Sequence, residues 1–534
     1  MVLADKMAFS AKYPIAEILQ DYGYKKFFFI SVILILVCFN NNLLRSMKLT
    51  CIMEAPSLGV EIFSFLKVWG LMPAMFLFTS LYFYLAKKLT YEQIFCVFVW
   101  IFLLFFLCFL CFFYPKNSSL EIASVQILSE NWLPKCLYSV VLMVKYWHFS
   151  LFYIFAELWS GVMLSLLVWG LINDNTFFYE AKTIYPIFLL ITNLTTIVSG
   201  EASQILTFKT RYQFLNLFDS AWQQSFIAQL LVVTLLCGLI LIIFLNFNDV
   251  LKGGSVAKTI NPPSVVGYSK ISVSRELIPL PKTNHRVSLT SELCTPYHRP
   301  YSSSKLATCS TSSNLVLVNG GTLLLAQDTI LHMAILVFSY TVIYNLFEII
   351  WINQVKINYP NLVDFNLYFA SITKYIGITG TISSMVFILL NKFRLSIQWI
   401  AKACFLPIAC FIVTILFLLS FYQIFGILTS NTTLLIGSCQ IILGRVCKYT
   451  IFDETKEVAL TTLPQNTRMV GKAVVDLFSF KLGQFTSNLL VQILLLFFLN
   501  ITGITPCLLS VVVTMVVIWV ISVIKLWRHL SYML

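Results

Sequence analysis

The chain has 534 residues, of which 59% are hydrophobic, 15% aromatic and only 11% charged, and its mean hydropathy is +0.85. With 47 phenylalanines, this composition excludes a soluble enzyme or a soluble binding module. The formal charge of +13 does not indicate a nucleic-acid-binding surface, because the basic residues are scattered between apolar runs. We therefore expect a polytopic membrane protein that binds no nucleic acid.

Apolar runs long enough to cross a bilayer recur along the chain. A hydrocarbon core about 30 Å thick requires about 20 mainly apolar residues in a helix. Six such runs precede a polar stretch and six follow it, which predicts an all-α protein with twelve transmembrane helices in two six-helix halves. The predicted spans are residues 27–47, 62–86, 93–114, 138–172, 184–207, 223–247, 330–352, 367–391, 400–422, 431–450, 473–499 and 506–526.

The polar stretch between the halves is rich in Ser, Thr, Pro and Lys, a composition that cannot bury a core and predicts a linker. Lys and Arg are concentrated on one side of the predicted membrane, which places both termini and this linker in the cytoplasm. The polar first residues do not have the pattern of a cleavable signal peptide. The predicted segments are an N-terminal segment 1–26, an N-terminal half 27–247, the linker 248–328, a C-terminal half 329–526 and a tail 527–534.

An internal repeat supports the division into halves. The run Asn42-Leu43-Leu44-Arg45 has its counterpart in Asn345-Leu346-Phe347-Glu348, and Lys67 corresponds to Lys374. The offset between matched positions stays between 303 and 307 residues. Two parallel repeats joined by a long cytoplasmic linker are typical of the major facilitator plan, in which substrate binds between the halves near the midplane.

Charged side chains inside the predicted spans mark a candidate binding site. Each costs about 2.5–3.5 kcal/mol at the centre of a membrane helix, so it usually faces a partner, a cavity or a ligand. Arg45, Lys48 and Lys67 place three cations within 23 residues, which suggests a site for an anion. Alternatively, Arg45 and Lys48 extend toward the headgroups from a helix end. Glu157 and Glu348 are expected to be protonated, paired with a cation, or engaged in a helix–helix hydrogen bond.

The remaining titratable residues separate into one candidate and several structural groups. Lys481 lies deeper in the eleventh span than Lys472 and Asp476, which have the spacing of an ordinary i,i+4 pair. His148 and His332 lie near span ends and are interpreted as satisfied structural histidines. The cysteines lie mostly in apolar segments without metal-ligand spacing, so we expect no metal and no cofactor. Without a G-x-x-x-x-G-K-[ST] phosphate loop, the chain is not expected to be an enzyme that hydrolyses nucleotide.

Several motifs, in order along nearly the whole chain, resemble the nucleotide transporter family, the ATP/ADP translocases of plastids, microsporidia, chlamydiae and rickettsiae. They are FLKVWGLMP, FYIFAELWSGVMLSLLVWGLINDN, FEIIW, and KYTIFDETKEVA followed by GKAVVD. The resemblance implies a major-facilitator-like carrier that exchanges or imports nucleotides. Within this resemblance, Arg45 and Lys48 match the family's R-x-x-K motif and Glu157 matches the Glu of its E-L-W motif. Glu348 and Trp351 match its E-x-x-W motif. The later lysine motifs of the family are matched by Lys448, Asp453, Lys456 and Lys472.

Four positions depart from the family pattern. Leu49 replaces an Asp, and Ile352, Gln354 and Gln484 replace lysines, a net loss of two positive charges. A less positive site favours a less negative ligand, because even one charge partner at about 4 Å contributes about 4 kcal/mol at an effective dielectric constant of 20. We therefore expect that this member does not simply trade ATP for ADP, and that NAD or a proton-coupled nucleotide is carried instead.

The functional hypothesis is a secondary transporter that imports a host nucleotide or NAD by alternating access, in exchange for ADP or another nucleotide. The alternatives are a proton-coupled nucleotide importer and, in another class, a non-transporting receptor or scaffold. We expect a monomer in the inner membrane of an obligate intracellular bacterium. Trp351 or Trp159 is expected to stack on the base. The predicted substrate-binding residues are Asn42, Arg45, Lys48, Lys67, Glu157, Asn345, Glu348, Trp351, Lys374 and Lys481.

Overall fold

The computed structural model describes residues 23–55, 59–115, 138–176, 178–210, 220–257, 320–392, 399–422, 430–461, 471, 474–498 and 501–533. These residues are almost entirely helical. The N-terminal half contains α3 (Tyr24–Glu54), α4 (Ile62–Phe65), η1 (Leu66–Leu71), α5 (Met72–Ala86), α6 (Tyr91–Cys108), η2 (Phe109–Phe113), α8 (Tyr138–Lys145), α9 (Trp147–Leu158), η5 (Trp159–Val168), α10 (Trp169–Asn175), α11 (Phe178–Ile205) and α12 (Ala221–Ala257).

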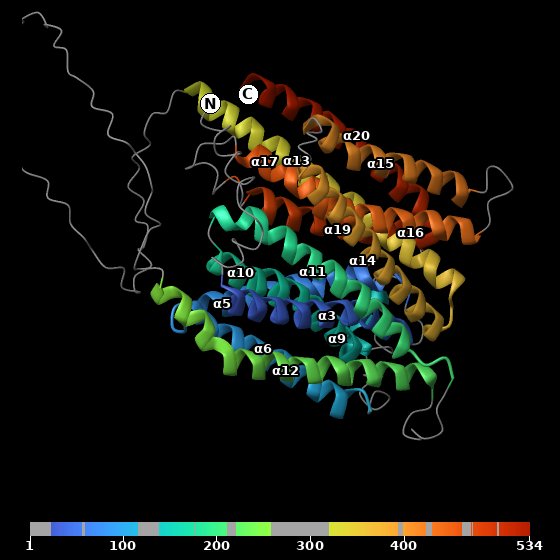
Figure 1. Cartoon of the computed structure of the whole chain (residues 1–534). Coiled ribbons are helices and arrows are strands. Elements are labelled where there is room, and N and C mark those ends of the chain that lie inside the picture. Colours follow the sequence, from blue (N-terminus) through green and yellow to red (C-terminus); the bar gives the residue numbers. More distant parts are fainter. Residues whose placement is uncertain are drawn as a thin grey trace, which may run out of the picture.

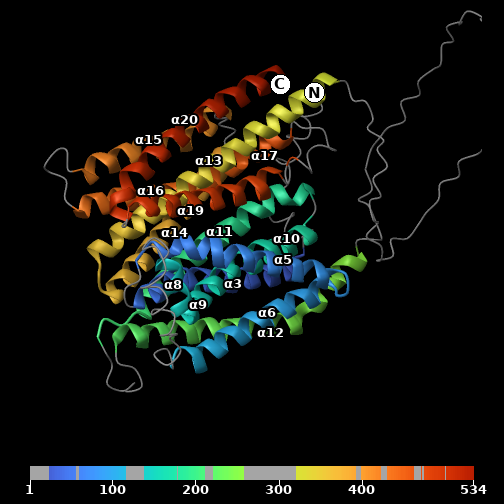
Figure 2. The ribbon, with the colours of Figure 1, turned by 180° about the vertical axis from the view of Figure 1, so that it is seen from behind.

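The C-terminal half repeats this plan and packs beside the first half, as the two differently coloured bundles in Figures 1 and 2 show. Its elements are α13 (Gly320–Asn358), α14 (Leu362–Lys392), α15 (Trp399–Phe421), α16 (Ser430–Cys447), η6 (Lys448–Phe452), α17 (Asp453–Thr461), η7 (Val474–Ser479), α19 (Phe480–Phe497) and α20 (Ile501–Met533).

The prediction of a polytopic all-α membrane protein is confirmed. Ten of the described helical runs are long and apolar enough to cross a membrane. The more polar α14 and the run from α16 to α17 lie in the same bundles, which is consistent with two sets of six. Helices α12 and α13 extend into the stretch predicted as a linker, whereas residues 258–319 and 1–22 lie outside the described residues.

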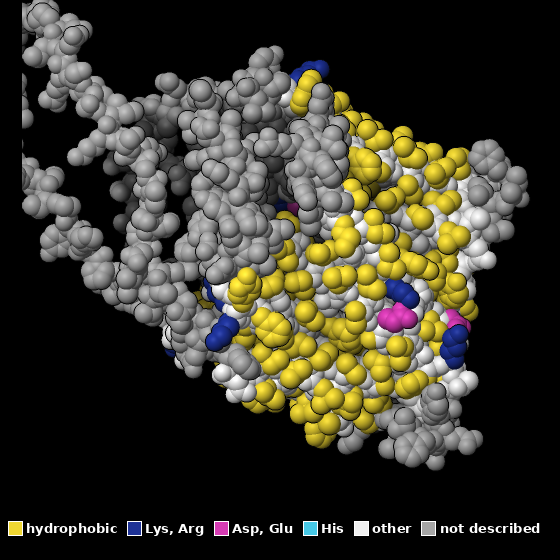
Figure 3. Space-filling model, viewed as in Figure 1, with side chains coloured by type: hydrophobic (Ala, Val, Ile, Leu, Met, Phe, Trp, Pro, Cys, Tyr) yellow, Lys and Arg dark blue, Asp and Glu magenta, His cyan; other side chains and the backbone are white. Residues whose placement is uncertain are grey.

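Apolar side chains form both the outer surface and the interior of the bundles. Phe76 is 79% exposed and Phe497 is 76% exposed, positions that are unfavourable in water and favourable against lipid tails. Figure 3 shows the resulting belt of hydrophobic side chains on one face, with few charged groups among them. Inside the N-terminal half, phenylalanines of α6 pack against α9, with the Phe105 and Phe155 rings stacked at 3.7 Å. The high phenylalanine content therefore serves both lipid contact and core packing.

The two halves meet along α11 and α14, where glycines let the backbones approach closely. A Cβ atom on Gly377 would lie only 2.6 Å from the backbone nitrogen of Ile197, and one on Gly200 only 2.7 Å from that of Lys374. Asn193 donates a hydrogen bond to Ser384 at 3.0 Å across this seam.

A second contact between the halves joins α4 and η1 to α19. The Gln492 amide donates to the Ser64 carbonyl at 3.0 Å and accepts from the Trp69 indole at 3.3 Å. Lys67, which lies in η1 between Ser64 and Trp69, belongs to the charged cluster described next.

Candidate functional site: a charged cluster between the halves

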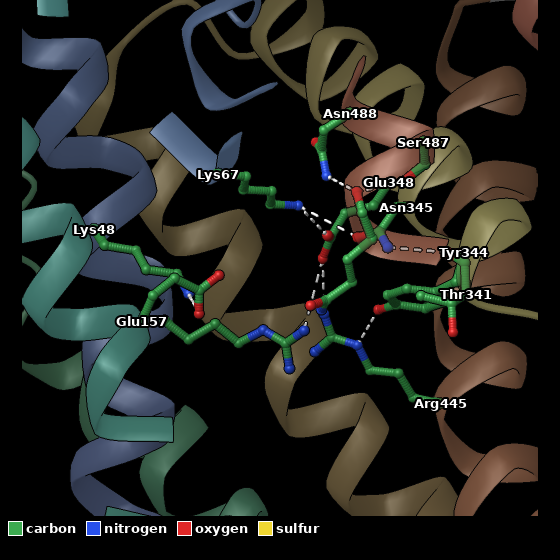
Figure 4. A network of polar contacts seen from close by, with 12 residues as sticks. Lys48, Lys67, Glu157, Thr341, Tyr344, Asn345, Glu348, Arg445, Ser487 and Asn488 are labelled. Carbon is green, nitrogen blue, oxygen red and sulfur yellow. Dashed lines mark hydrogen bonds and ion pairs between the residues drawn. The ribbon is translucent and has the colours of Figure 1, made fainter. Parts of the chain in front are cut away.

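Glu348 on α13 is a carboxylate at the centre of the molecule that contacts cations of both halves (Figure 4). Its oxygens lie 3.1 Å from Arg445 Nη2, 3.3 Å from Lys67 Nζ and 3.8 Å from Arg45 Nη2. Arg445 belongs to the same half as Glu348, whereas Lys67 and Arg45 come from the other half. Lys67 also contacts Asn345 Oδ1 at 3.5 Å, so three cations converge on this one carboxylate and one of them reaches the neighbouring amide as well.

Glu157 on α9 is the second carboxylate of the cluster. It forms a shorter ion pair than Glu348 does, with one lysine of its own half. Its Oε2 lies 2.7 Å from Lys48 Nζ on α3, with the two side chains 22% and 10% exposed. The Tyr153 ring lies 5.6 Å from the same ammonium group. Both charges belong to the N-terminal half, so this pair does not depend on how the halves are arranged. It also explains how Lys48 is accommodated inside the bundle rather than at the headgroups.

A small cavity opens beside the two carboxylate groups. It has a volume of about 50 Å³ and is lined by Lys67, Leu71, Met72, Met75, Glu157, Lys481, Gln484 and Asn488. Since one water molecule requires about 10–15 Å³ of such space, the cavity has room for a few waters and not for a nucleotide.

The cluster carries an excess of positive charge. Five cations and two carboxylates face one another between the halves or line the cavity, which leaves a formal excess of three positive charges. Charges interact strongly in a medium of low dielectric constant, so this excess favours an anionic ligand. The cations are Arg45, Lys48, Lys67, Arg445 and Lys481.

Four members of the cluster lie within or close to a π-helical segment. Lys67 lies within η1, Glu157 comes just before η5, Arg445 just before η6, and Lys481 just after η7. An extra residue in a helical turn redirects the side chains that follow, and such turns are frequent at functional sites. No signal in the sequence predicted these turns.

The sequence-predicted site residues divide into two groups. The structure brings together Arg45, Lys48, Lys67, Glu157, Asn345, Glu348 and Lys481. Three others lie elsewhere. Asn42 donates to Thr196 of its own half at 3.2 Å, and Lys374 pairs with Glu201 on the α11–α14 seam.

The third, Trp351, is buried inside the C-terminal half and donates from its indole to Ser438 at 3.0 Å. Trp159 is likewise buried and donates to the Val37 carbonyl at 3.2 Å. Neither ring offers an exposed face to a base in this conformation. The interpretation of His148 as a satisfied histidine is wrong, because both of its ring nitrogens are buried without a hydrogen-bond partner among the described residues. Lys472 and the side chain of Asp476 lie outside the described parts of the chain.

Sequence reasoning missed Arg445 and Asn488. Arg445 is a cation inside the apolar tenth span, the same signal that identified Glu157, and it contacts both Glu348 and the Tyr344 hydroxyl. Asn488 had no such signal, because an amide within an apolar span is common.

Only one of the four departures from the family pattern reaches the cavity. Gln484 lines it, whereas Leu49, Ile352 and Gln354 are buried and are not among the lining residues. The predicted deficit of positive charge therefore applies at one position of the cavity wall.

Comparison with known proteins identifies the family. A family model described as TLC ATP/ADP transporter matches residues 6–530. The chain belongs to the TLC ATP/ADP transporter family. The resemblance predicted from the sequence motifs is thus confirmed, and the chain is a transporter-family protein rather than an enzyme.

Individual relatives extend over most of the chain. It is similar to ADP,ATP carrier protein 2 of Chlamydia pneumoniae, with 28% identity over 508 residues, covering 93% of this chain and 87% of the relative. ADP,ATP carrier protein 4 of Rickettsia conorii is also 28% identical over 508 residues, covering 92% and 89%. Among solved structures, a D-xylose-proton symporter matches with a TM-score of 0.53 at 11% identity, covering 95% of this chain and 98% of that one. This likeness shows the shared major-facilitator-like fold alone.

Proposed function

We propose that this protein exchanges nucleotides across the membrane and that their phosphate groups bind the cations of the central cluster. The observation that carries this proposal is the formal excess of three positive charges gathered between the two halves. A polyphosphate replaces its hydration shell with such cations, and an arginine fork can bind two phosphate oxygens at once. The names of the relatives, ADP,ATP carriers, support the same class of substrate.

Glu348 supplies the physical reason for exchange. Without substrate it holds Lys67 and Arg45 from the opposite half, so the empty carrier is held together by ion pairs across its midline. A bound polyphosphate competes with Glu348 for the same cations and offers them more negative charge. Pulling unpaired charges apart away from water is expensive, so the empty carrier reorients slowly and the loaded carrier reorients readily. Net movement without a counter-substrate is therefore suppressed.

The two halves move against each other to admit the nucleotide, as in other carriers built from repeats. The distribution of Lys and Arg supports cytoplasmic termini, and we propose import of a host nucleotide across the inner membrane of an obligate intracellular bacterium by a monomer. Both carboxylates of the cluster have cation partners, which favours strict exchange over proton coupling.

ATP and ADP are the first candidates for the exchanged pair, and NAD is the second. Gln484 favours NAD, because it removes one positive charge from the cavity wall relative to the family pattern. NAD carries a diphosphate and a positive nicotinamide ring, so it is less negative than ATP and needs fewer cations.

The test is uptake into proteoliposomes containing the purified full-length chain. Labelled ATP, ADP, NAD, GTP, CTP and UTP are each offered with and without internal ADP, and with and without a protonophore. We expect rapid uptake of one or more of these compounds only into loaded vesicles. Uptake that ignores internal nucleotide and collapses with the protonophore would establish the proton-coupled alternative and overturn the proposal.

A further inference from the structure

A buried hydrogen-bond acceptor without a partner lines the cavity beside the charged cluster. Asn488 on α19 is 1% exposed, and its Oδ1 accepts no hydrogen bond from the described residues. Its Nδ2 donates to the Gln484 carbonyl at 2.6 Å, which fixes the orientation of the amide. A buried acceptor left unpaired costs about 1–3 kcal/mol, so its position in the cavity wall requires an explanation.

The wall of this cavity combines polar and apolar groups. Figure 4 shows Asn488 on the same side of the cluster as Lys67, and both line the cavity. The apolar part consists of Leu71, Met72 and Met75. Methionine side chains are flexible and polarisable, so they adapt to flat ligands of different shape.

Gly161 gives Met75 its position in this wall. A Cβ atom on Gly161 would lie 3.1 Å from the terminal methyl group of Met75, so a larger residue there would displace that side chain. The cavity thus has one wall that can form hydrogen bonds and one that can shift to make room.

We propose that this cavity is the subsite for an amino-bearing nucleobase such as adenine, whose exocyclic N–H group donates to Asn488 Oδ1. The inference rests on the proposed function, because Lys67 belongs both to the cavity wall and to the cluster assigned to the phosphates. An acceptor beside the donors Lys67 and Lys481 fits a ligand edge on which a donor adjoins an acceptor. Adenine and cytosine present such an edge, whereas a bare phosphate presents only acceptors and would repel the Asn488 oxygen.

Gln484 contributes further polar groups to the cavity wall that contains Asn488. Its Oε1 accepts from Lys481 at 3.4 Å, while its side-chain nitrogen donates no hydrogen bond to the described residues. Both residues line the cavity, and among the described residues Asn488 Oδ1 is an acceptor and the Gln484 side-chain nitrogen a donor without a partner. An amide side chain is suited to this edge, because in DNA recognition one Asn or Gln accepts from N6 of adenine and donates to N7.

The size of the cavity sets a condition on this inference. Its volume of about 50 Å³ admits water and not a base, so the base enters only when the halves separate and Met72 and Met75 change rotamer. The subsite is thus formed during the transport cycle rather than held open throughout it.

The experiment compares inhibition of labelled-nucleotide uptake by ATP and by inosine triphosphate, which carries the same phosphates and a carbonyl in place of the 6-amino group. The wild-type chain should prefer ATP by about tenfold, the equivalent of about 1.4 kcal/mol. Asn488→Leu should bring the two inhibitors close to equality, while Asn488→Asp, which keeps the acceptor, should keep the preference. CTP against UTP repeats the comparison for the 4-amino group of cytosine.

The matched control is Asn40→Leu. Asn40 is also fully buried with an unpaired Oδ1, but it lies between α3 and α12 inside one half and should leave the ATP preference unchanged. A wild-type chain that binds inosine triphosphate as well as ATP, or an Asn488→Leu variant that keeps the wild-type ratio, overturns the base subsite. If Asn488→Leu does not reach the membrane, the wild-type ratio and Asn488→Asp decide. Failure of all nucleotides to be exchanged refutes the proposed function instead.

Discussion

The two halves use the same pair of helices to hold an ion pair, but with the signs exchanged. In the N-terminal half the first helix supplies the cation and the fourth the carboxylate, with Lys48 and Glu157 2.7 Å apart. In the C-terminal half the first helix supplies the carboxylate and the fourth the cation, with Glu348 and Arg445 3.1 Å apart. The first pair is complete within its half, whereas Glu348 is shared with two cations of the opposite half.

The exchange of signs makes the halves complementary. Arg45 and Glu348 occupy matching positions of the internal repeat, and they face each other across the midline at 3.8 Å. Two identical halves would bring like charges together there, and like charges repel. The comparison therefore assigns different roles to similar pairs. In the proposed exchange mechanism, the N-terminal pair stays within its half, whereas Glu348 changes partners when the halves move.

The largest effect on stability is expected from breaking the ion pair between Lys48 and Glu157. Lys48→Ala leaves Glu157 buried without its partner, which should cost about 3–5 kcal/mol of stability. We expect a large drop in the thermal unfolding temperature of the detergent-purified protein and little protein in the membrane. The double variant Lys48→Met/Glu157→Leu should recover stability without recovering transport, because it removes both charges. A single variant as stable as the wild type would show that the pair is not structural.

The second prediction concerns the shared carboxylate. Glu348→Gln removes the group that holds Lys67 and Arg45 across the midline, so the empty carrier should reorient more easily. Uptake into vesicles without internal nucleotide should rise by about tenfold, the rate change that corresponds to a barrier lower by about 1.4 kcal/mol.

The control for this variant is Glu201→Gln, which removes a carboxylate outside the central cluster, leaves Lys67 and Arg45 paired with Glu348, and should keep uptake dependent on internal nucleotide. Tight coupling that persists in Glu348→Gln would remove Glu348 from the exchange mechanism.

The sequence predicted the class of fold and much of the cluster, because a charge inside an apolar span is expensive wherever it occurs. It could not predict which charges meet. Glu348 and Arg445 are 97 residues apart in the chain, and their contact depends on how α13 packs against α16. Lys67 and Lys374 match in the repeat, yet only Lys67 reaches the cluster, since the sign exchange between the halves leaves Lys374 beside a different partner. Trp351 resembles a binding residue by motif and is nevertheless enclosed in its own half.

The third prediction compares two arginines around Glu348. Arg45 is 33% exposed and 3.8 Å from the carboxylate, so Arg45→Ala should leave stability unchanged and weaken apparent nucleotide affinity by about fivefold, the equivalent of about 1 kcal/mol for a loosely held charge. Arg445 is closer to the carboxylate and more buried. Arg445→Ala should therefore lower the stability of the protein as well as its apparent affinity for nucleotide. The measurements are the KM for uptake and thermal unfolding. Arg45→Lys keeps the positive charge but loses the planar guanidinium group. Its KM for uptake should lie between those of the wild type and Arg45→Ala.

The smallest effect is expected from the counterpart of Lys67 in the second half. Lys374 pairs with Glu201 across the α11–α14 seam, where the two side chains are 33% and 49% exposed, and this pair lies outside the central cluster. Exposed ion pairs contribute about 0–1 kcal/mol, so Lys374→Ala should change the KM for nucleotide and the unfolding temperature only slightly. Lys67→Ala, by contrast, removes a cation held by Glu348 and Asn345 and should lower uptake strongly. Equal losses in the two variants would mean that the halves contribute their repeated lysines alike, and the division of roles between them would be wrong.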